Sequence, residues 1–512
     1  MATLIDTVRS NPAQQERFSF AAPASQQVSS SGLSLIPGLI GLMIAVVAYW
    51  TSSIWLLCTA VIPFLWMGLA SPVRLVEMLL FTTPVFPVIR FVQEAVQARR
   101  VSTKGLFLSV DDPLIAALVV VWAIRVFQKT RVARELFPSA LLWLAILYPS
   151  VIAINATRLD FGEVTVSALY YLKWLQYAML VFAIPQMVPS AQVPRLLANS
   201  RRVVTLVICL SASFATYEVA ESFRTGTYSA NALFPRASAF FGTLDPLRFG
   251  ASEDPVNFGV YAMVAGSIAI GLFSTKARAG GALTLAGIIA SALALLLSAS
   301  RAPILSAALA LGKIQKLRPA HVMALVLLVA LGGLVTVAVF PEMLTITMER
   351  FEAIGDFQGA SENSASDRLM IALNSPVFEV DQYWLVGHGF FSYRFVAEEH
   401  LARLTNGVSR SLYNFLLTAW YDAGPAGLVL WLAVFVQINR RLSMASTTSP
   451  SDHVRSLATG LRGALWGLTL ASMFGEVPYA WRVMGFFYTC LGICLAGDFH
   501  YRRQIPVRTV RA

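Results

Sequence analysis

Residues 320–340 read AHVMALVLLVALGGLVTVAVF, an apolar run that contains no Asp, Glu, Lys or Arg. A helix of about 20 residues is about 30 Å long, which is the thickness of the hydrocarbon core of a bilayer. Lipid offers no hydrogen-bond partner to an open backbone, so such a run satisfies its own backbone groups as a helix. The stretch therefore predicts a membrane-spanning helix.

Runs of the same kind recur along the whole chain. They lie at residues 33–50, 53–70, 74–93, 111–127, 137–155, 165–188, 203–220, 256–274, 280–297, 302–312, 320–340, 411–437, 457–475 and 481–496. The segment 74–93 contains two prolines and the segment 302–312 is too short to cross alone, so these two are left open. The pattern predicts an all-α polytopic integral membrane protein with about 12, and up to 14, transmembrane helices and one large extracytoplasmic loop.

Composition excludes the soluble classes. Of 512 residues, 56% are hydrophobic and 13% charged, with a mean hydropathy of +0.65, whereas soluble domains carry about 25% charged residues. The net charge of +11 sits in short loops between apolar runs, so nucleic acid is not an expected partner. The four cysteines lie inside apolar runs, and no nucleotide-binding, zinc or nucleophile-elbow motif is present. We expect no cofactor and no metal.

The distribution of Lys and Arg predicts that both termini are cytoplasmic. With the N-terminus inside, the inward loops and tail carry Arg125, Lys129, Arg131, Arg134, Arg195, Arg201, Arg202, Lys276, Arg278, Lys313, Lys316, Arg318, Arg440, Arg441, Arg455, Arg462, Arg502, Arg503, Arg508 and Arg511. The loop 94–112 opposes this assignment, since it is placed outside and carries Arg99, Arg100 and Lys104. Either the segment 74–93 does not cross, or neighbouring acidic residues weaken the signal.

The orientation divides the chain into regions. We expect a disordered cytoplasmic N-terminus at 1–31 without a cleaved signal peptide, transmembrane helices at 32–220, an extracytoplasmic loop at 221–255, transmembrane helices at 256–340, a large extracytoplasmic cap at 341–410, C-terminal transmembrane helices at 411–497 and a cytoplasmic tail at 498–512. The cap is long, mixed in charge and rich in aromatic residues, which predicts a small folded unit rather than disorder.

Arginines expected at the outer face are candidates for binding an anion. Arg301 lies between two apolar runs, in Leu-Ser-Ala-Ser-Arg at 297–301, where a charge is costly unless it faces a cavity or an interface. It is either a snorkelling helix-end arginine or a guanidinium that binds a phosphate through two hydrogen bonds. Arg236 and Arg248 lie in the first outer loop and Arg368 in the cap, where exposed arginines are usually solvated. Together they would suit a lipid diphosphate.

Two histidines of the cap are candidate proton acceptors. His388 stands in Gly387-His388-Gly389, where flanking glycines permit a tight turn or a close approach of the backbone to a ligand, and His400 follows in the same cap. A lone loop histidine is more often solvated, although either one could accept a proton near neutral pH. Asn414 begins the helix after the cap and either caps that helix or contributes to the site.

The order of these features resembles the O-antigen ligase and O-antigen polymerase superfamily of bacterial membrane glycan enzymes, over roughly residues 230–440. The resemblance rests on the Arg248–Phe258 string, the Ser-Arg string ending at Arg301, the Arg368 segment, the Gly387–Gly389 turn and the Tyr413–Asn414 helix start. It implies metal-independent glycosyl transfer at the outer face of the bacterial inner membrane, from an undecaprenyl-diphosphate-linked oligosaccharide. The implied diphosphate ligands are Arg301 and, less directly, Arg248 and Arg368; polysaccharide export or chain-length machinery is an implied partner.

The chain departs from the ligase pattern at one position. Ligases of this family usually carry a His-Asn pair where this chain has Tyr413-Asn414, and a neutral tyrosine is a poor base because its reference pKa is about 10. The base would then be His388, His400 or an acidic residue such as Glu399, or deprotonation is late and weakly assisted. The departure favours a polymerase of exopolysaccharide or O-antigen repeat units over a ligase. A flippase of lipid-linked oligosaccharides and a structural partner of an export complex remain alternatives of other classes.

Overall fold

The computed structural model describes residues 35–51, 53–85, 88–90, 107–127, 138–159, 161–225, 255–273, 281–298, 301–314, 384–392, 414–475, 477 and 480–504. Several expectations lie outside these residues. They are the helix 320–340, both chain ends and most of the two large loops, including Arg236, Arg248, Arg368, Glu399 and His400.

The described part is almost entirely helical. Its helices are α3 (Ile36–Thr51), α4 (Ile54–Thr59), α5 (Val61–Ala70), α6 (Pro72–Val85), α8 (Asp112–Phe127), α9 (Ser139–Asn155), α10 (Phe161–Ala178), α11 (Leu180–Met187), the 3₁₀ turn η3 (Ser190–Gln192), α12 (Val193–Thr225), α14 (Pro255–Phe273), α15 (Gly281–Leu297), α16 (Arg301–Lys313), α22 (Phe415–Thr448), α23 (Asp452–Ser472) and α24 (Trp481–Gln504). Most of the apolar segments predicted within the described residues are thus helices.

The segment predicted at 74–93 is not one helix. Helix α6 ends at Val85, directly after Pro84, and strand β1 (Val88–Arg90) follows. This strand pairs in antiparallel register with β2 (Phe107–Ser109). Pro84 lies in the last turn of α6, where it lacks the N–H that would continue the helical hydrogen bonds. Apart from these two strands of three residues each, the described residues bear out the expected helical fold.

Three helical stretches within the described residues are long and apolar enough to cross a bilayer, judged by length and composition. They are Ser190–Ser213, Phe415–Thr448 and Val483–Arg503. Shorter apolar helices lie at Ile36–Ala48, Ile54–Ala70, Ser139–Asn155, Asn257–Phe273, Ala282–Leu296 and Ala302–Lys313. The chain is a helical membrane protein, and the predicted number of crossings stays a prediction.

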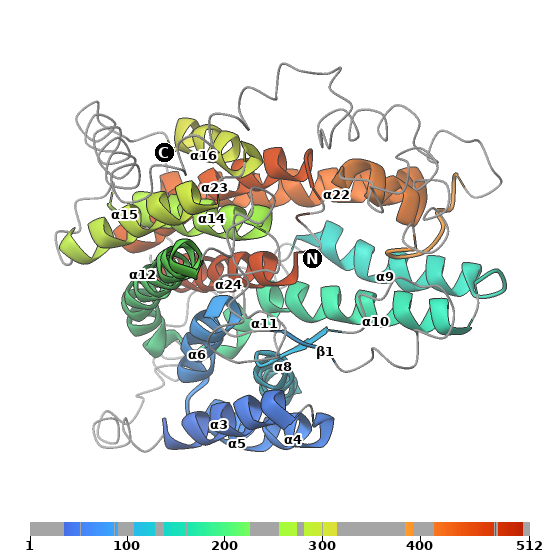
Figure 1. Ribbon diagram of the computed structural model, residues 1–512, viewed down its shortest axis with the longest axis horizontal. Helices are drawn as coiled ribbons and strands as arrows, with labels where there is room; N and C mark the ends of the chain where they lie inside the picture. Colours follow the sequence, from blue (N-terminus) through green and yellow to red (C-terminus); the bar gives the residue numbers. More distant parts are fainter. Residues whose placement is uncertain are drawn as a thin grey trace, which may run out of the picture.

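The helices pack into one bundle with a side group beside it. Figure 1 shows α14, α15, α16, α22 and α23 in its upper part, with α9 and α10 lying together at the right beside α22. Helices α14 and α23 touch through their backbones, because a Cβ atom built on Gly271 would lie 2.5 Å from Gly460 Cα. Helices α3, α4 and α5 form the lower edge.

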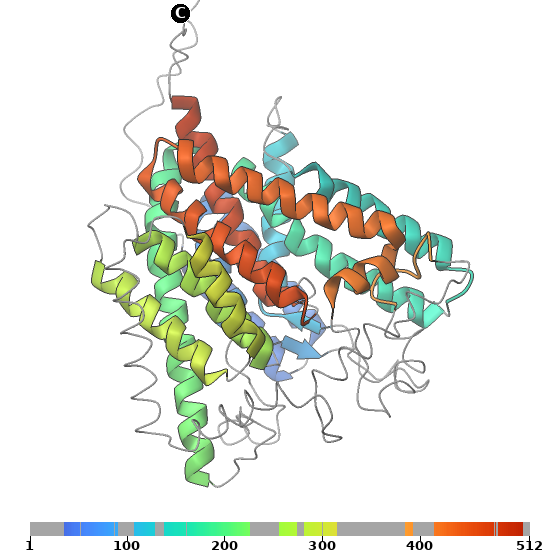
Figure 2. The same ribbon diagram turned by 90° about the horizontal axis from the view of Figure 1, so that it is seen from above.

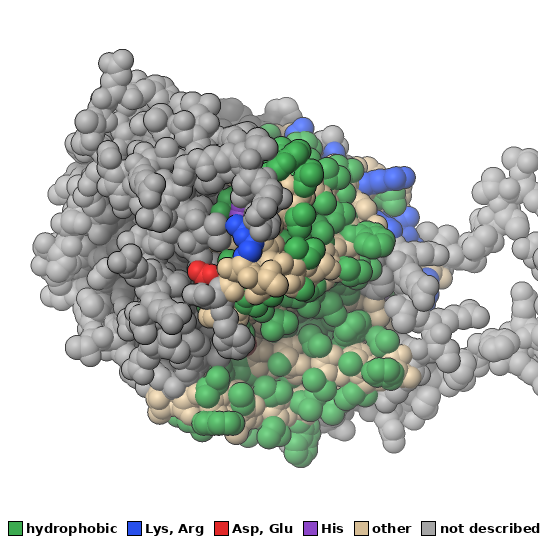
Figure 3. All heavy atoms as spheres, turned by 90° about the vertical axis from the view of Figure 1, so that its right-hand side faces the viewer, with side chains coloured by type: hydrophobic (Ala, Val, Ile, Leu, Met, Phe, Trp, Pro, Cys, Tyr) green, Lys and Arg blue, Asp and Glu red, His purple; other side chains and the backbone are tan. Residues whose placement is uncertain are grey.

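Large apolar side chains cover the outside of the bundle. Phe127 is 90% exposed and Trp55 is 80% exposed. Figure 3 shows hydrophobic side chains spread across the described part of one face, with Lys and Arg gathered mainly toward one edge. Contiguous exposed apolar surface is rare on soluble monomers and is the normal outer surface of a membrane protein.

Helix ends that the charge pattern assigns to the cytoplasm meet one another. Arg125 Nη1, at the end of α8, donates a hydrogen bond to Met187 O at the end of α11 over 3.2 Å. Arg502 Nη2 in α24 donates to Thr448 Oγ1 at the end of α22 over 2.7 Å. These contacts agree with the predicted orientation, which itself stays a prediction.

Candidate functional site

The described part of the predicted cap, residues 384–392, is a turn that lies against the N-terminal part of α22. Figure 2 shows this short orange segment between α22 and the ends of α9 and α10. Residues 387–392 are all buried, whereas Trp384 and Leu385 are exposed. The turn is therefore built into the helical bundle, and the reading of His388 as a solvated loop histidine is wrong, since that side chain is 6% exposed.

A break in α22 creates the surface that receives the turn. The backbone leaves helical geometry at Ala423 (φ −140°, ψ 25°) and Gly424 (φ 62°, ψ −167°), and Pro425 follows. Proline has no N–H, so Tyr421 O loses the partner that it would have four residues later in a regular helix. The non-helical Gly424 likewise interrupts the ladder next to Asp422 O.

The turn supplies the missing donors. His388 N donates to Tyr421 O over 2.8 Å, and Gly389 N donates to Asp422 O over 3.1 Å. An unsatisfied carbonyl costs free energy inside a bilayer. The amides of the turn therefore satisfy the carbonyls that the kink in α22 leaves without partners. Trp420 Nε1 adds a hydrogen bond of 3.2 Å to Trp384 O at the edge of the contact.

Glycine is required at two of these positions. Gly387 has a φ of +87°, and a Cβ atom there would lie 2.5 Å from Ala423 Cα and from Asp422 O. Gly424 has a φ of +62°, and its Cβ atom would lie 2.1 Å from Leu385 O. Positive φ and backbone contact both exclude a side chain. The pattern Gly387-His388-Gly389 thus forms a tight turn, one of the two predicted alternatives, and its close contact at Gly387 is with the backbone of α22.

The side chain of His388 is held by Tyr421. The two rings stack with centroids 4.1 Å apart and planes 7° apart, and His388 Nδ1 lies 3.3 Å from Tyr421 O. A carbonyl oxygen can only accept a hydrogen bond, so this contact forms when Nδ1 carries the proton. In that tautomer Nε2 is the nitrogen that can act as a base.

Helices α9 and α10 hold the other side of the turn. Asn155 Nδ2, at the end of α9, donates to Gly387 O over 3.1 Å, and the hydroxyl of Ser167 in α10 donates to Phe390 O. The ring of Phe390 packs edge-on against Tyr148 at 4.4 Å. Asn155 and Ser167 could not be identified from the sequence as partners of the turn, because each is a single polar residue in or beside an apolar run.

Asn414 is the N-cap of α22. Its Oδ1 accepts hydrogen bonds from Leu416 N at 2.9 Å and from Leu417 N at 3.3 Å, and its Nδ2 lies 3.5 Å from Met473 O. An N-cap asparagine satisfies amide groups that the first helical turn leaves open. The capping role that sequence analysis left open is thus present, and participation in a reaction stays a prediction.

Arg301 is the first residue of α16. The chain around it lies close to α14, because a Cβ atom on Gly259 would lie 2.6 Å from Ser298 Oγ and 2.8 Å from Pro303 Cγ. The Ser-Arg string is therefore held against α14 on both sides of Arg301. Its proposed diphosphate partners Arg236, Arg248 and Arg368, and the candidate bases His400 and Glu399, lie outside the described residues.

A buried ion pair that sequence analysis missed joins α8, α10 and the hairpin. Lys173 Nζ contacts Asp112 Oδ1, and it donates to Ser109 Oγ over 3.1 Å. Gln176 Nε2 donates to the same Asp112 oxygen over 2.6 Å, and Tyr177 OH donates to Asp111 Oδ2 over 2.9 Å. A charged lysine inside an apolar segment costs free energy unless it has a partner. The position of Lys173 within the apolar run 165–188 was therefore the sequence feature that could have indicated this pair.

Within the described residues, no group of three or more His, Cys, Asp or Glu side chains is arranged to hold a metal ion. The expectation of no cofactor and no metal stays a prediction. Around the turn, the described polar groups include backbone donors and carbonyls, the stacked imidazole of His388 and the buried carboxyl group of Asp422. This set can position a substrate and accept a proton.

Comparison with known proteins adds one finding. A family model described as O-Antigen ligase (Wzy_C) matches residues 263–432. No curated protein sequence matches the chain. The matched stretch contains Arg301, Arg368, His388 and the start of α22, and it excludes Arg236 and Arg248. Residues 263–432 of this helical membrane protein thus match the O-antigen ligase (Wzy_C) family, which confirms the resemblance that the sequence motifs indicate.

Proposed function

We propose that this membrane glycan enzyme polymerises lipid-diphosphate-linked oligosaccharide repeat units at the outer face of the bacterial cytoplasmic membrane. The observation that carries the proposal is the buried 387–389 turn seated on the α22 kink, inside the region that matches the family. A site that transfers sugars needs a fixed backbone to orient donor and acceptor. The turn and the kink supply such a frame beside apolar helices that suit a lipid carrier.

The donor would be an oligosaccharide on undecaprenyl diphosphate. We propose that Arg301, with Arg248, Arg368 and Arg236, holds the diphosphate, since guanidinium groups bind phosphate oxygens through paired hydrogen bonds. Diphosphate is a good leaving group, so charge stabilisation and an oriented acceptor hydroxyl are sufficient for transfer. The C–O bond to the diphosphate breaks as the acceptor oxygen bonds the anomeric carbon, and the hydroxyl proton leaves to a base.

His388 is our first candidate for that base. The contact of Nδ1 with Tyr421 O forms in the tautomer in which Nε2 is the proton acceptor. His400, Glu399 and Asn414 are the remaining candidates for assisting the acceptor. Of those that can accept a proton, His388 is the one within the described residues, and its ring stacks on Tyr421.

A ligase that transfers glycan from undecaprenyl diphosphate to another acceptor is the second candidate. The description of the matching family as O-antigen ligase favours it. The Tyr413-Asn414 pair, where ligases of the family usually carry His-Asn, favours the polymerase.

The test is the chain length and carrier linkage of surface glycan in cells that lack the gene. Complementation uses the wild type or Arg301→Ala at equal abundance. Glycan that stops at single repeat units, with no restoration by Arg301→Ala, supports the polymerase. Long chains that accumulate on the lipid carrier identify a ligase, and single units on the cytoplasmic face identify a flippase. Full restoration by Arg301→Ala would refute the anionic site.

A further inference from the structure

The C-terminal end of α9 contacts the buried turn on both sides of His388. Asn155 Nδ2 donates a hydrogen bond to Gly387 O over 3.1 Å. Leu159 approaches the second glycine of the turn, since a Cβ atom on Gly389 would lie 3.8 Å from Leu159 Cδ1. The short stretch of chain from Asn155 to Leu159 therefore lies against the two residues that flank His388.

Arg158 lies in this stretch, and its side chain is joined to the same asparagine. Arg158 Nη1 donates a long hydrogen bond of 3.4 Å to Asn155 Oδ1, and Arg158 N donates to Asn155 O over 2.9 Å. The Asn155 side chain is completely buried, and its Nδ2 also donates to Val151 O over 2.9 Å. One buried amide group therefore connects the guanidinium of Arg158 to the backbone carbonyl of Gly387.

The side chain of Arg158 is accessible from outside the bundle, because the residue is exposed. Figure 3 faces this end of the bundle and shows Lys or Arg atoms next to the His side chain that is visible there. The charge pattern predicts that this end of α9 is extracytoplasmic, which is the side of the proposed transfer. A positive residue in a short outer loop runs against the usual distribution of Lys and Arg, and a role in binding an anion explains it.

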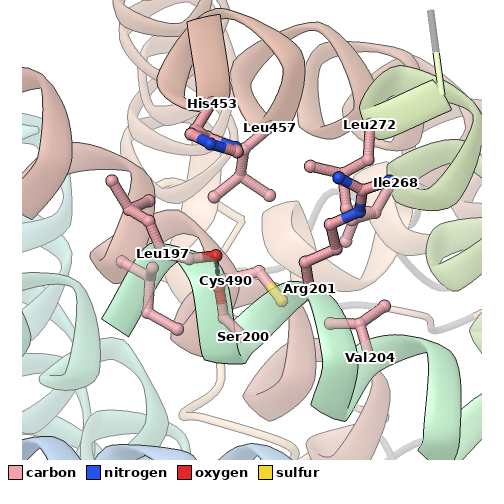
Figure 4. Close-up of a pocket in the computed structure, with 10 residues that line it drawn as sticks. Leu197, Ser200, Arg201, Val204, Ile268, Leu272, His453, Leu457 and Cys490 are labelled. Atoms are coloured by element: carbon pink, nitrogen blue, oxygen red, sulfur yellow. Dashed lines mark hydrogen bonds between the residues drawn. The ribbon is translucent and has the colours of Figure 1, made fainter. Parts of the chain in front are cut away.

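Arg201 is a contrasting case at another place in the bundle. Figure 4 shows Arg201 at the edge of a cavity between α12, α14, α23 and α24. The volume of this cavity is about 10 Å³, which is room for about one water molecule. The Nε and Nη2 atoms of Arg201 donate to Thr284 Oγ1 over 3.0 and 2.6 Å. Neither a phosphate group nor a lipid headgroup fits there, whereas Arg158 is open to the surroundings.

We propose that Arg158 binds the diphosphate of the lipid-linked donor near His388, a role that rests on the proposed function. Arginine presents its N–H donors in one plane, and a pair of them fits two oxygens of a phosphate group. The contact with Asn155 keeps the guanidinium on the side of the turn that α9 contacts. Arg158 lies outside residues 263–432, so an N-terminal part of the chain would complete a site in the stretch that matches the family.

Binding separates this role from catalysis. Undecaprenyl diphosphate and the neutral alcohol undecaprenol are titrated against the full-length protein in detergent, with native mass spectrometry as the readout. Arg158→Gln removes the charge, and Arg158→Lys keeps the charge without the planar pair of donors. Arg440→Gln is the matched control, because Arg440 is an exposed arginine of α22.

We expect Arg158→Gln to bind undecaprenyl diphosphate about tenfold more weakly than the wild type, since a charge-assisted contact is lost. The affinity of Arg158→Lys should lie between those two. Arg440→Gln should bind undecaprenyl diphosphate as the wild type does. Undecaprenol carries the same tail without the anion, so its binding should be the same in all four proteins.

Three results would overturn the proposal. The first is an unchanged affinity of Arg158→Gln for undecaprenyl diphosphate. The second is an equal loss for both probes, which would make Arg158 a structural support of the α9 end. The third is an equal loss in Arg440→Gln, which would reflect the overall positive charge of the protein.

Transfer activity in the same preparations distinguishes this inference from the proposed function. A protein that binds undecaprenyl diphosphate through Arg158 and transfers no sugar supports the inference and refutes the proposed function. Transfer and binding at wild-type levels in Arg158→Gln support the proposed function and refute the inference.

Discussion

A methyl group has no room at Gly424. Its Cβ atom would meet Leu385 O at 2.1 Å, and the backbone conformation (φ 62°, ψ −167°) by itself costs a side chain about 1–3 kcal/mol. We predict that Gly424→Ala displaces the turn from α22 and stops glycan elongation, while the protein still inserts in the membrane. Glycan length in complemented cells and protease cleavage of the purified variant near residue 390 measure the two effects.

Gly312→Ala is the control for that substitution. Gly312 lies in α16, within the stretch that matches the family, and an added Cβ atom meets nothing within 4 Å. Alanine in place of a helical glycine stabilises by about 1 kcal/mol or less. Elongation should be normal in this variant. Normal elongation in Gly424→Ala as well would show that the seated turn is not needed.

The role of His388 can be divided between its two nitrogens. An asparagine amide can replace Nδ1–H as a donor to Tyr421 O, but neither asparagine nor glutamine can accept a proton near neutral pH. We predict that His388→Asn and His388→Gln both reduce transfer about 100-fold or more, as loss of a general base does. Transfer rates with a lipid-linked donor in detergent provide the measurement. Retained activity in His388→Asn alone would instead make His388 a positioning residue.

At the residue scale, sequence reasoning found the positions whose chemistry is visible in a short string. Gly387 and Gly389 were predicted to permit a tight turn or a close approach of the backbone to a ligand, and both have the positive φ of a tight turn. Asn414 was predicted to cap a helix as one alternative, and it does so. The contacts of Asn155 and Ser167 with the turn were not predicted, because each residue lies more than 200 positions away from the turn in the chain. Nothing in a local pattern records such a partner.

At the element scale, the Lys173–Asp112 pair fixes α10 against α8. Both side chains are largely buried, so removing one leaves the other charge uncompensated. We predict that Lys173→Met destabilises the protein by about 3–5 kcal/mol. The double variant Lys173→Met/Asp112→Asn should be less destabilised, since the leftover charge is gone. Thermal unfolding in detergent measures both.

An exposed ion pair is the control for this cycle. Asp452 contacts Arg455 within α23, and their side chains are 54% and 33% exposed. Exposed pairs contribute about 1 kcal/mol or less, so Asp452→Asn should change stability little. A Lys173→Met variant as stable as Asp452→Asn would contradict the assigned importance of the buried pair.

Element boundaries were predictable where apolarity ended and unpredictable where backbone geometry decided them. Segments 280–297 and 302–312 agree with α15 and α16 to within a residue or two. The segment 165–188 is instead divided into α10 and α11 at Met179, within a run that stays apolar. Hydropathy reports burial in lipid, not hydrogen-bond continuity, so it cannot show such breaks.

At the scale of the whole molecule, the orientation is testable with single cysteines. Thr157 and Ser190 are both exposed in the structure, and the charge pattern places Thr157 outside and Ser190 inside. We predict that a membrane-impermeant maleimide labels Thr157→Cys in intact cells and labels Ser190→Cys only after lysis. Cys58 is exposed and is replaced by serine in both variants. The reverse labelling pattern would invert the topology.

The kink in α22 also sets the order in which the turn at 384–392 and the helix that it contacts can assemble during synthesis. Residues 384–392 leave the ribosome before Tyr421 and Asp422, whose carbonyls receive their amides. Until α22 is inserted, the turn has no surface to pack against. Until the turn docks, the carbonyls of Tyr421 and Asp422 lack the amide donors that satisfy them in the folded protein. A chain that ends before Phe415 would therefore carry most of the stretch that matches the family and no assembled turn, so biogenesis of the site waits for the C-terminal helices.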